Sequence, residues 1–347
     1  MILKKISLSN FRNFKNQELV FNRRLTIVAG ENSRGKTNLL EAIYFVLKGQ
    51  GFREEKEEEL INLNFSRGKV TAVFEDNGAD NVFEIDIDKS NGKTVKIFFV
   101  DRTKKRLILY KKELTSVVLF TPDQINIIKG APSLRREYFN AVLSERDDEY
   151  KKHLNNFENA LRRRNRILEK HVSEIKLRDE LSFWNDYLEK ESRYITEKRS
   201  EYVVYLNNHK KLDSKMFSIS YLRNDFSKKN LTEVFPKEMA LRKTLIGPQK
   251  DDFDIIVQDA TSKKDIHRYG SRSEERLAVF WLKINELRYF ENELGKPILL
   301  LDDIFSELDY HNKKIILNLI GQYQTIASTT DEEFLKEIKS DKEIINL

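Results

Sequence analysis

Short apolar runs separated by turn residues fill the first 120 residues. They are rich in Val, Ile, Leu and Phe, as β-strands are: "ILKKISLSNF", "LTIVAG", "KVTAVFE", "VFEIDID", "TVKIFFV", "RLILY" and "SVVLF". Asn-Gly pairs in "NGADN" and "KSNGK" predict tight hairpin turns, so the strands are expected to form an antiparallel meander. One helix, residues 37–49, interrupts them and is expected to end near Gly49 and Gly51, because glycine often ends a helix.

The pattern changes after "PDQINIIKGAPS". Residues 133–170 contain neither Gly nor Pro and predict one long helix. Its apolar positions repeat at steps of three, four and seven: Leu154, Phe157, Leu161 and Leu168. A second stripe of the same kind follows: Leu181, Trp184, Leu188, Ile195 and Tyr202. Joined near Arg178, the two stripes predict an antiparallel helical hairpin. They are expected to face its core; a surface for a partner protein is the alternative.

Mixed α/β patterning returns after about Leu241. "GPQKDDFDIIV" predicts a turn into a strand, and "SRSEERLAVFWLKINELRYFENEL" predicts a long amphipathic helix. "PILLLDD" and "YQTIAST" are typical of buried strands. We therefore expect an α/β head that is split in sequence by an inserted arm. Its N-terminal part would span 1–125, the helical arm 126–238, and its C-terminal part 239–347.

Composition narrows the class of protein. Of the 347 residues, 34% are charged and 39% apolar, and 22 Phe with 13 Tyr provide for a folded core. There is no run of 18 apolar residues, no signal-peptide pattern and no cysteine, which fits a cytoplasmic protein that uses no membrane. The net charge of +6 permits a nucleic-acid or anionic-membrane partner; a Lys-rich surface without a polyanion partner is the alternative.

A phosphate-binding loop is the first candidate site. "GENSRGKT", residues 30–37, matches G-x-x-x-x-G-K-[ST] between a strand and a helix. In such a loop the backbone N–H groups surround the phosphates, Lys36 reaches the β- and γ-phosphates, and Thr37 places its hydroxyl on Mg²⁺. The candidate ATP-binding residues here are Gly30, Glu31, Asn32, Ser33, Arg34, Gly35, Lys36, Thr37 and Asn38.

Two carboxylates supply the second half of the site. "ILLLDD", residues 298–303, predicts a buried parallel strand whose carboxyl end carries Asp302 and Asp303. Ligands bind at that end of the strands in open α/β sheets. Asp302 is placed to hold Mg²⁺, and Asp303 to polarise a water for attack on the γ-phosphate. An acidic strand end without a metal is the alternative.

Longer segments carry a family resemblance. "LLLDDIFSELD" resembles the Walker B segment and D-loop of ATP-binding-cassette (ABC) ATPases, and above all those of SMC heads. "LSNFRNF", "SVVLFTPDQINIIKGAPSLRREYFN" and "LIGPQKDDFDI" are similar to segments of the RecF family. The resemblance extends over nearly the whole chain, and on these segments the chain is identified as a member of that family. The resemblance implies a P-loop NTPase head of ABC/SMC type, with an antiparallel β lobe and an inserted α-helical, short coiled-coil-like arm.

The same resemblance implies how the site works. Two heads sandwich two ATP molecules, so that each site joins one subunit's phosphate loop to the other's signature segment. The signature helix would start at "GSRSEER", with Ser271 facing the partner's γ-phosphate. Gln124 would approach Mg²⁺, and Arg12 would lie beside the phosphates. Thr330 falls near the switch segment and is given no role.

Two residues depart from the family pattern. Ser33 and Ser273 stand where glycine is usual. A serine at 33 is tolerated if its φ stays negative. At 273 a side chain can weaken the ATP-bound dimer or its hydrolysis, because glycine there allows close backbone approach to the partner's phosphate.

The arm carries the candidate DNA contact. "LRRRNR", residues 161–166, places Arg162, Arg163 and Arg166 on one broad helix face, which could contact phosphates without reading bases. A solvated face with ion pairs along the helix is the alternative.

Together these features predict a DNA-binding, DNA-stimulated and slow ATPase of recombinational repair and replication-fork maintenance. ATP-driven homodimerisation would clamp duplex or junction DNA near single-strand gaps and support recombinase loading, and RecR-like and RecO-like mediators are the expected partner proteins. One alternative is an ATP-binding structural or regulatory clamp that acts through partner proteins with little hydrolysis. Another, a small-molecule P-loop kinase, explains neither the arm nor "SELD".

Overall fold

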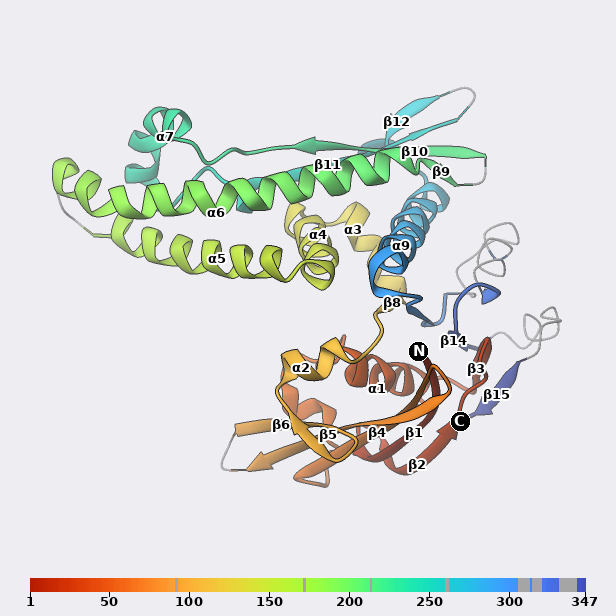
Figure 1. Ribbon diagram of the computed structural model, residues 1–347. Helices are drawn as coiled ribbons and strands as arrows, with labels where there is room; N and C mark the ends of the chain where they lie inside the picture. Colours follow the sequence, from red (N-terminus) through yellow and green to blue (C-terminus); the bar gives the residue numbers. More distant parts are fainter. Residues whose placement is uncertain are drawn as a thin grey trace. The chain divides into compact units, whose positions relative to one another are not determined.

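The chain forms two compact units (Figure 1). The structure, a computed structural model, describes residues 1–90, 93–170, 173–212, 214–259, 262–304, 313, 320–330 and 342–347. The first unit comprises Met1–Asp123 and Leu287–Leu347, and the second comprises Gln124–Glu286. Residues 239–286, which the sequence assigns to the head, thus make their contacts within the same unit as the arm helices. No helix of the described residues is long and apolar enough to cross a membrane.

An antiparallel sheet makes up one layer of the first unit. In the described residues its strand order is β2-β1-β4-β5-β6-β7. The strands are β1 (Ile2–Phe11), β2 (Phe14–Val20), β4 (Arg67–Asp76), β5 (Ala79–Ser90), β6 (Lys93–Val100) and β7 (Thr103–Lys105). The predicted antiparallel meander is confirmed for these strands, but it is wrong for "LTIVAG" and "SVVLF", which pair in a parallel sheet. The turn at Asn77 and Gly78 has two positive φ angles, as a type I′ hairpin requires. The second predicted turn, at 91–92, lies outside the described residues.

A parallel sheet positions the site. Its order is β15-β3-β14-β13-β8, and Figure 1 shows red β3 beside blue β15. The strands are β3 (Leu25–Ala29), β8 (Val117–Phe120), β13 (Ile298–Leu301), β14 (Thr325–Thr329) and β15 (Glu343–Asn346). Leu301 pairs with Phe120 and Ala327, and Thr329 with Ala29. The parallel register therefore brings the carboxyl ends of β3, β13 and β14 to one edge.

Helix α1 (Lys36–Lys48) packs against strands of both sheets, and its apolar residues join them in one core. Among the described residues of this unit, two short helices follow, η1 (Glu57–Leu60) and α2 (Leu107–Lys112). The prediction of a strand at "RLILY" is wrong, because these residues belong mostly to α2. Only Tyr110 is buried, against Phe83 and Phe98, while Ile108 is 65% exposed, so the run has the single buried position of a short helix.

The second unit contains the arm. Helices α5 (Asp148–Leu168) and α6 (Glu174–Asn208) lie side by side as a long hairpin (Figure 1). Among the described residues, the other helices of this unit are α3 (Asn126–Lys129), α4 (Pro132–Arg146), α7 (Lys228–Leu241), η3 (Pro248–Lys250) and α8 (Ile266–Tyr269). Two more, η2 (Pro122–Ile125) and α9 (Arg272–Leu294), have residues in both units. A sheet of order β12-β11-β10-β9 completes the second unit, with β9 (Lys211–Leu212), β10 (Lys215–Leu222), β11 (Asp252–Gln258) and β12 (Lys263–Asp265).

Two predictions about the hairpin are wrong in detail. The helix predicted over 133–170 breaks at Asp147, whose carboxylate accepts the backbone N–H groups of Glu149 and Tyr150 at 2.9 and 3.0 Å and so caps α5. The two arm helices are joined before Glu174 and not near Arg178. Arg178 lies inside α6 because buried Leu residues on both sides of it form one cluster with α5 and α7: Leu168, Leu177, Leu181 and Phe235.

Most of the predicted stripe on α6 is buried. Leu181, Leu188, Ile195 and Tyr202, spaced by heptads, are inaccessible to solvent, whereas Trp184 is only half-buried. On α5, Phe157 and Leu168 are buried, and Leu154 and Leu161 are half-buried. Heptad spacing thus predicts the core of the hairpin, and Trp184 is its exception.

The "GPQKDD" segment ties the arm to the small sheet. The Asp251 carboxylate, at the end of η3, accepts from Arg199 of α6 at 2.6 Å, from the Asn224 N–H at 2.8 Å and from the Tyr221 hydroxyl. Asp252 accepts from both Nε and Nη2 of Arg135 of α4, at 2.7 and 3.0 Å. The two carboxylates therefore join α4, α6 and the start of β11, and their role in this structure is architectural.

Candidate nucleotide-binding site

The loop between β3 and α1 has the backbone of a phosphate cradle. Gly30 and Gly35 have φ angles of 153° and 110°. A Cβ on Gly30 would lie 2.7 Å from the Leu347 carbonyl oxygen, and one on Gly35 would lie 2.5 Å from Asn13 Nδ2. Both the conformation and the space therefore require glycine at these two positions.

Lys36 lies across this loop. Its Nζ donates to the carbonyl oxygens of Gly30 and Glu31 at 2.6 and 2.8 Å, and the side chain is 7% exposed. Lys36 is also the first residue of α1, where the N–H groups of a helix terminus favour an anion. The ammonium group and the helix terminus thus concentrate positive charge at one point.

The two halves of the predicted site meet. Thr37 Oγ1 donates to Asp302 Oδ1 at 3.0 Å, and Ser328 Oγ of β14 donates to the same oxygen at 2.7 Å. Octahedral Mg²⁺ with oxygen ligands at about 2.0–2.1 Å holds adjacent ligands about 3 Å apart, so this spacing fits one shared cation. Among the described residues no three acidic or His side chains cluster as a metal site. Thr37 and Asp302 supply one hydroxyl and one carboxylate oxygen, and Mg²⁺ usually completes such a shell with phosphate and water oxygens.

Asp303 follows on a sharply turned backbone. Its φ is 46°, and its N–H donates to Ser328 Oγ at 2.9 Å. A left-handed conformation is unusual for a residue other than glycine, and such strain clusters at functional sites. Ser328 thus contacts both carboxylate residues, the Asp302 side chain and the Asp303 backbone, and fixes the end of β13.

A buried carboxylate in α1 holds two arginines. Glu41 is inaccessible to solvent and accepts from Arg12 Nε at 2.8 Å and from Arg12 Nη2 at 3.1 Å. Arg53 donates to it through its backbone N–H at 3.1 Å and its Nη2 at 3.2 Å. Arg12 is thus fixed one helical turn beyond Thr37.

A cavity of about 750 Å³ opens beside these arginines. Such a volume is within the range of small-molecule pockets, about 300–1,000 Å³. Its walls are Arg12, Asn13, Asn38, Arg53, Glu59, Ile61, Asn62, Leu63 and Asn64. Two of the predicted ATP-binding residues, Arg12 and Asn38, therefore line a space large enough for a nucleoside.

The condition for a tolerated serine at position 33, a negative φ, is not met. Its φ is 68°, so the serine occupies the left-handed region and not a negative φ. The four-residue spacing between the two required glycines leaves the intervening chain little choice of path. Serine therefore takes a conformation that is about 1–2 kcal/mol less favourable for an L-residue.

Ser271 begins the signature helix, α9, in a capping box. Its N–H and hydroxyl donate to Glu274 Oε2 at 2.8 and 3.0 Å. Burial raises the pKa of Glu274, but hydrogen bonds from Lys215, Ser271 and Lys264 outweigh it and lower the pKa to about 2. Ser273 is exposed in the first turn of α9.

For the other predicted site residues, the structure gives a position but no described contact with the phosphate loop. Gln124, in η2, and Ser271, directly before α9, belong to the second unit, and their predicted roles remain predictions. Thr330 directly follows β14 and is exposed. The predicted D-loop, "SELD", lies outside the described residues.

The three arginines predicted to contact DNA lie on the surface of α5. Arg162, Arg163 and Arg166 are exposed, whereas the fourth arginine of "LRRRNR", Arg164, is buried. Arg164 donates to Glu238 at 2.6 Å and to Thr244 Oγ1 at 2.7 Å. The run therefore divides into one arginine that holds α7 and three that face solvent.

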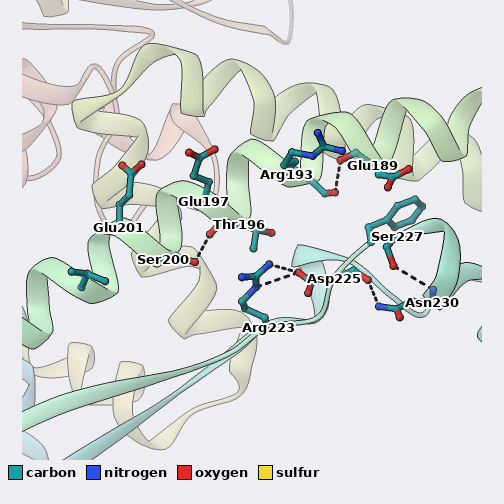
Figure 2. A pocket seen from close by; sticks show the side chains of 13 residues that line it. Glu189, Arg193, Thr196, Glu197, Ser200, Glu201, Arg223, Asp225, Ser227 and Asn230 are labelled. Carbon is teal, nitrogen blue, oxygen red and sulfur yellow. Dashed lines mark hydrogen bonds and ion pairs between the residues drawn. The ribbon is translucent and has the colours of Figure 1, made fainter.

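A groove of about 930 Å³ lies between α6 and residues 223–230 (Figure 2). Four carboxylates and two guanidinium groups line it, and Figure 2 shows Arg223 turned toward Asp225, to which it donates at 2.8 Å. The charged groups in its wall are Glu189, Arg193, Glu197, Glu201, Arg223 and Asp225. The acidic excess makes this groove unsuited to a polyanion, and none of the predicted site residues lines it.

Sequence reasoning missed three residues of the site: Ser328, Glu41 and Arg53. Glu41 lies four residues after Thr37 in a helix, so its place on the loop side could have been inferred. Ser328 reaches the site through the register of β14, and Arg53 reaches it through the path of the chain after α1. No local sequence pattern predicts either position.

Comparisons with known proteins agree with this geometry. A family model described as the RecF/RecN/SMC N-terminal domain matches residues 2–346. The chain is 33% identical to DNA replication and repair protein RecF of Natranaerobius thermophilus, over 96% of this chain and 92% of the relative. It is 30% identical to that of Agathobacter rectalis, over 97% and 94%.

Solved structures give the same result. The recombination mediator protein RecF with ATP, of the RecFOR pathway, superposes with a TM-score of 0.82 at 30% identity, over 95% of this chain and 92% of that one. An Smc head domain of Pyrococcus furiosus, at 18% identity and a TM-score of 0.57, shares the fold. The fold is thus an ABC/SMC-type ATPase head with an inserted helical arm, and the chain belongs to the RecF family.

Proposed function

We propose that this chain binds ATP with Mg²⁺ and acts in DNA replication and recombinational repair, as part of a RecFOR-type pathway. The contact that carries the proposal is the 3.0 Å hydrogen bond between Thr37 and Asp302, because it joins the two halves of a magnesium–phosphate site from positions 265 residues apart. The solved relative with ATP supports the choice of nucleotide.

In the proposed site each residue has a defined task. The loop N–H groups bind phosphate oxygens, and Lys36 exchanges the Gly30 and Glu31 carbonyls for the β- and γ-phosphates. Thr37 and Asp302 would hold Mg²⁺, which neutralises charge on the phosphates when bound. The nucleoside occupies the cavity beside Arg12 and Arg53.

Hydrolysis and dimerisation follow from the same arrangement. Asp303 accepts a proton from the attacking water, and the Ser328 contact holds its backbone in place. Ser271 of a second copy, at the N-terminus of its α9, meets the γ-phosphate, and Gln124 approaches Mg²⁺. ATP thereby closes a homodimer in the cytoplasm that clamps duplex or junction DNA, works with RecR-like and RecO-like mediators, and hydrolyses ATP slowly.

A clamp that binds ATP but scarcely hydrolyses it is the second candidate, since exposed Ser273 stands in the first turn of the signature helix. The mass in solution with and without Mg·ATP, repeated with a gapped duplex, tests the shared part of both proposals. We expect the mass to double with ATP. A monomer at every ATP concentration would contradict the clamp.

Asp303→Asn tests the proposed base. Asparagine also tolerates a positive φ, so the backbone is retained. ATP binding should be unchanged and the dimer should persist, while steady-state hydrolysis falls by about 100-fold or more, the usual contribution of a general base. Phosphate release and mass are measured on the same samples. Hydrolysis at the parent rate would assign the proton transfer to another group.

Replacing Arg162, Arg163 and Arg166 with alanine tests the arm. If all three reach phosphates, the slope of log K against log salt should fall by up to about 2.7, or about 0.9 per phosphate. Affinity should fall alike for all duplex sequences, and ATP hydrolysis without DNA should change little.

Arg193→Ala is the matched control, because this exposed arginine lies on α6 in the acidic groove. It should leave the salt slope at the parent value. If the triple variant behaves like this control, the three arginines are solvent-exposed side chains that do not contact DNA, and the DNA-binding surface lies elsewhere.

A further inference from the structure

Three aromatic rings form a partly exposed row on α6. Phe183, Trp184 and Tyr187 lie within one turn of the helix, and we name them the aromatic ledge. The Phe183 ring lies 5.1 Å from that of Trp184 and 6.1 Å from that of Tyr187, almost parallel to the latter at 24°. Phe183 is 64% exposed, and the other two are half-buried. The ledge therefore offers ring faces and edges to solvent.

The ledge is not part of the hairpin core. Leu181 and Leu188, on either side of it in sequence, are inaccessible to solvent and carry the heptad packing. The three rings contact one another at the flank of the helix, where leaving an aromatic side chain exposed forgoes about 1.5–3 kcal/mol of burial. A row of such rings is typical of a binding surface.

Positive charge lies directly against the ledge. The guanidinium group of Arg163, on α5, lies 5.3 Å from the centre of the Trp184 ring. Arg162 and Arg166 are exposed on the same helix. Two carboxylates next to the rings are paired with lysines: Glu180 with Lys170 at 2.5 Å, and Asp186 with Lys228 at 3.0 Å. The surface thus combines stacking rings with available cations.

We propose that the aromatic ledge stacks unpaired bases of single-stranded DNA while the neighbouring arginines hold its phosphates. The inference rests on the proposed function and deepens it, by assigning to the arm the single strand that borders a gap. Aromatic rings beside a cationic track are the chemistry that binds single strands without sequence preference, because every base has a ring face. Paired bases in a duplex offer no such face, so the ledge is selective for the unpaired strand.

The test compares single strands with and without bases. Parent, Phe183→Ala and Ile175→Ala proteins are titrated with fluorescent oligo(dT) and with an abasic oligonucleotide of equal length and charge. Phe183→Ala should weaken oligo(dT) binding by roughly 5- to 100-fold, the usual loss for one stacked base. Ile175→Ala is the control, since this aliphatic residue of α6 is 76% exposed. It should bind as the parent does. The abasic strand should bind the parent weakly and be insensitive to Phe183→Ala.

Tryptophan fluorescence gives a second measurement. The chain has two tryptophans; Trp281 is buried and Trp184 is in the ledge, so oligo(dT) should quench the fluorescence of the parent but not that of a Trp184→Phe variant.

Duplex binding separates the two proposals, because Phe183→Ala should leave duplex affinity and its salt slope unchanged. If the parent binds duplex DNA and Phe183→Ala binds oligo(dT) as tightly as the parent does, the aromatic ledge is not the single-strand site. That result would leave the proposed function standing. No binding of either DNA by the parent would overturn both, and a Phe183-dependent change in self-association without DNA would make the ledge a contact between copies.

Discussion

Replacing Arg199 with alanine should lower the free energy of unfolding by about 3–5 kcal/mol, the usual effect of breaking a buried ion pair. Arg199 is 2% exposed and donates to Asp251 at 2.6 Å, to the Pro248 carbonyl at 2.8 Å and to Asn140 at 2.9 Å. Its loss leaves the Asp251 carboxylate buried without its cation. Urea unfolding followed by circular dichroism measures the change.

Arg193→Ala on the same helix is the control and should stay within about 0.5 kcal/mol of the parent, as exposed substitutions do. A double-mutant cycle with Asp251→Ala should give a coupling energy of about 1–3 kcal/mol. If Arg199→Ala unfolds at the parent urea concentration, the "GPQKDD" segment does not tie the arm to the sheet.

Replacing Lys36 with alanine should abolish ATP-driven dimerisation together with hydrolysis. Truncating one partner of a buried charged pair costs about 2–5 kcal/mol, which corresponds to a roughly 30-fold or greater loss of ATP affinity. Calorimetric titration with Mg·ATP gives the affinity, and the mass in solution gives the association.

Lys48→Ala, at the other end of α1, is the matched control and should bind ATP as the parent does. Circular dichroism of both variants separates loss of the ammonium group from loss of the fold. Normal ATP-dependent dimers of the Lys36 variant would contradict the phosphate-loop assignment.

The features that sequence alone could predict are those that neighbouring residues determine. Gly30 and Gly35 have the positive φ angles of one short loop, and Lys36 directly follows them, so the motif indicates the phosphate cradle from local sequence alone. Asp302 could be placed because a buried strand directly precedes it. The division of the arm arginines also followed from helical spacing, which separates buried Arg164 from its exposed neighbours.

The features that could not be predicted have two kinds of cause, packing against distant partners and local backbone conformation. "RLILY" has the composition of a strand, but only Tyr110 is buried in the core. A single buried position favours a short helix over a strand. The break at Asp147 depends on a cap within a sequence that otherwise favours a continuous helix. Ser33 takes a positive φ because the glycines on either side fix the path of the loop, which outweighs the preference of the residue itself.

The order of the parallel sheet determines when this protein can fold during synthesis. β13 and β14, which separate β8 from β3, come from residues 298–329, after the whole arm has been made. Before these residues are synthesised, the strands that lie between β3 and β8 are missing. The apolar face of α1 also lacks its packing against β14. Pairings of such long sequence separation form slowly, and unpaired apolar strand edges are prone to aggregation. A premature stop codon before residue 298 would thus release an aggregation-prone chain that lacks Asp302 and Ser328, and we expect chaperones to hold the nascent head until its last strands emerge.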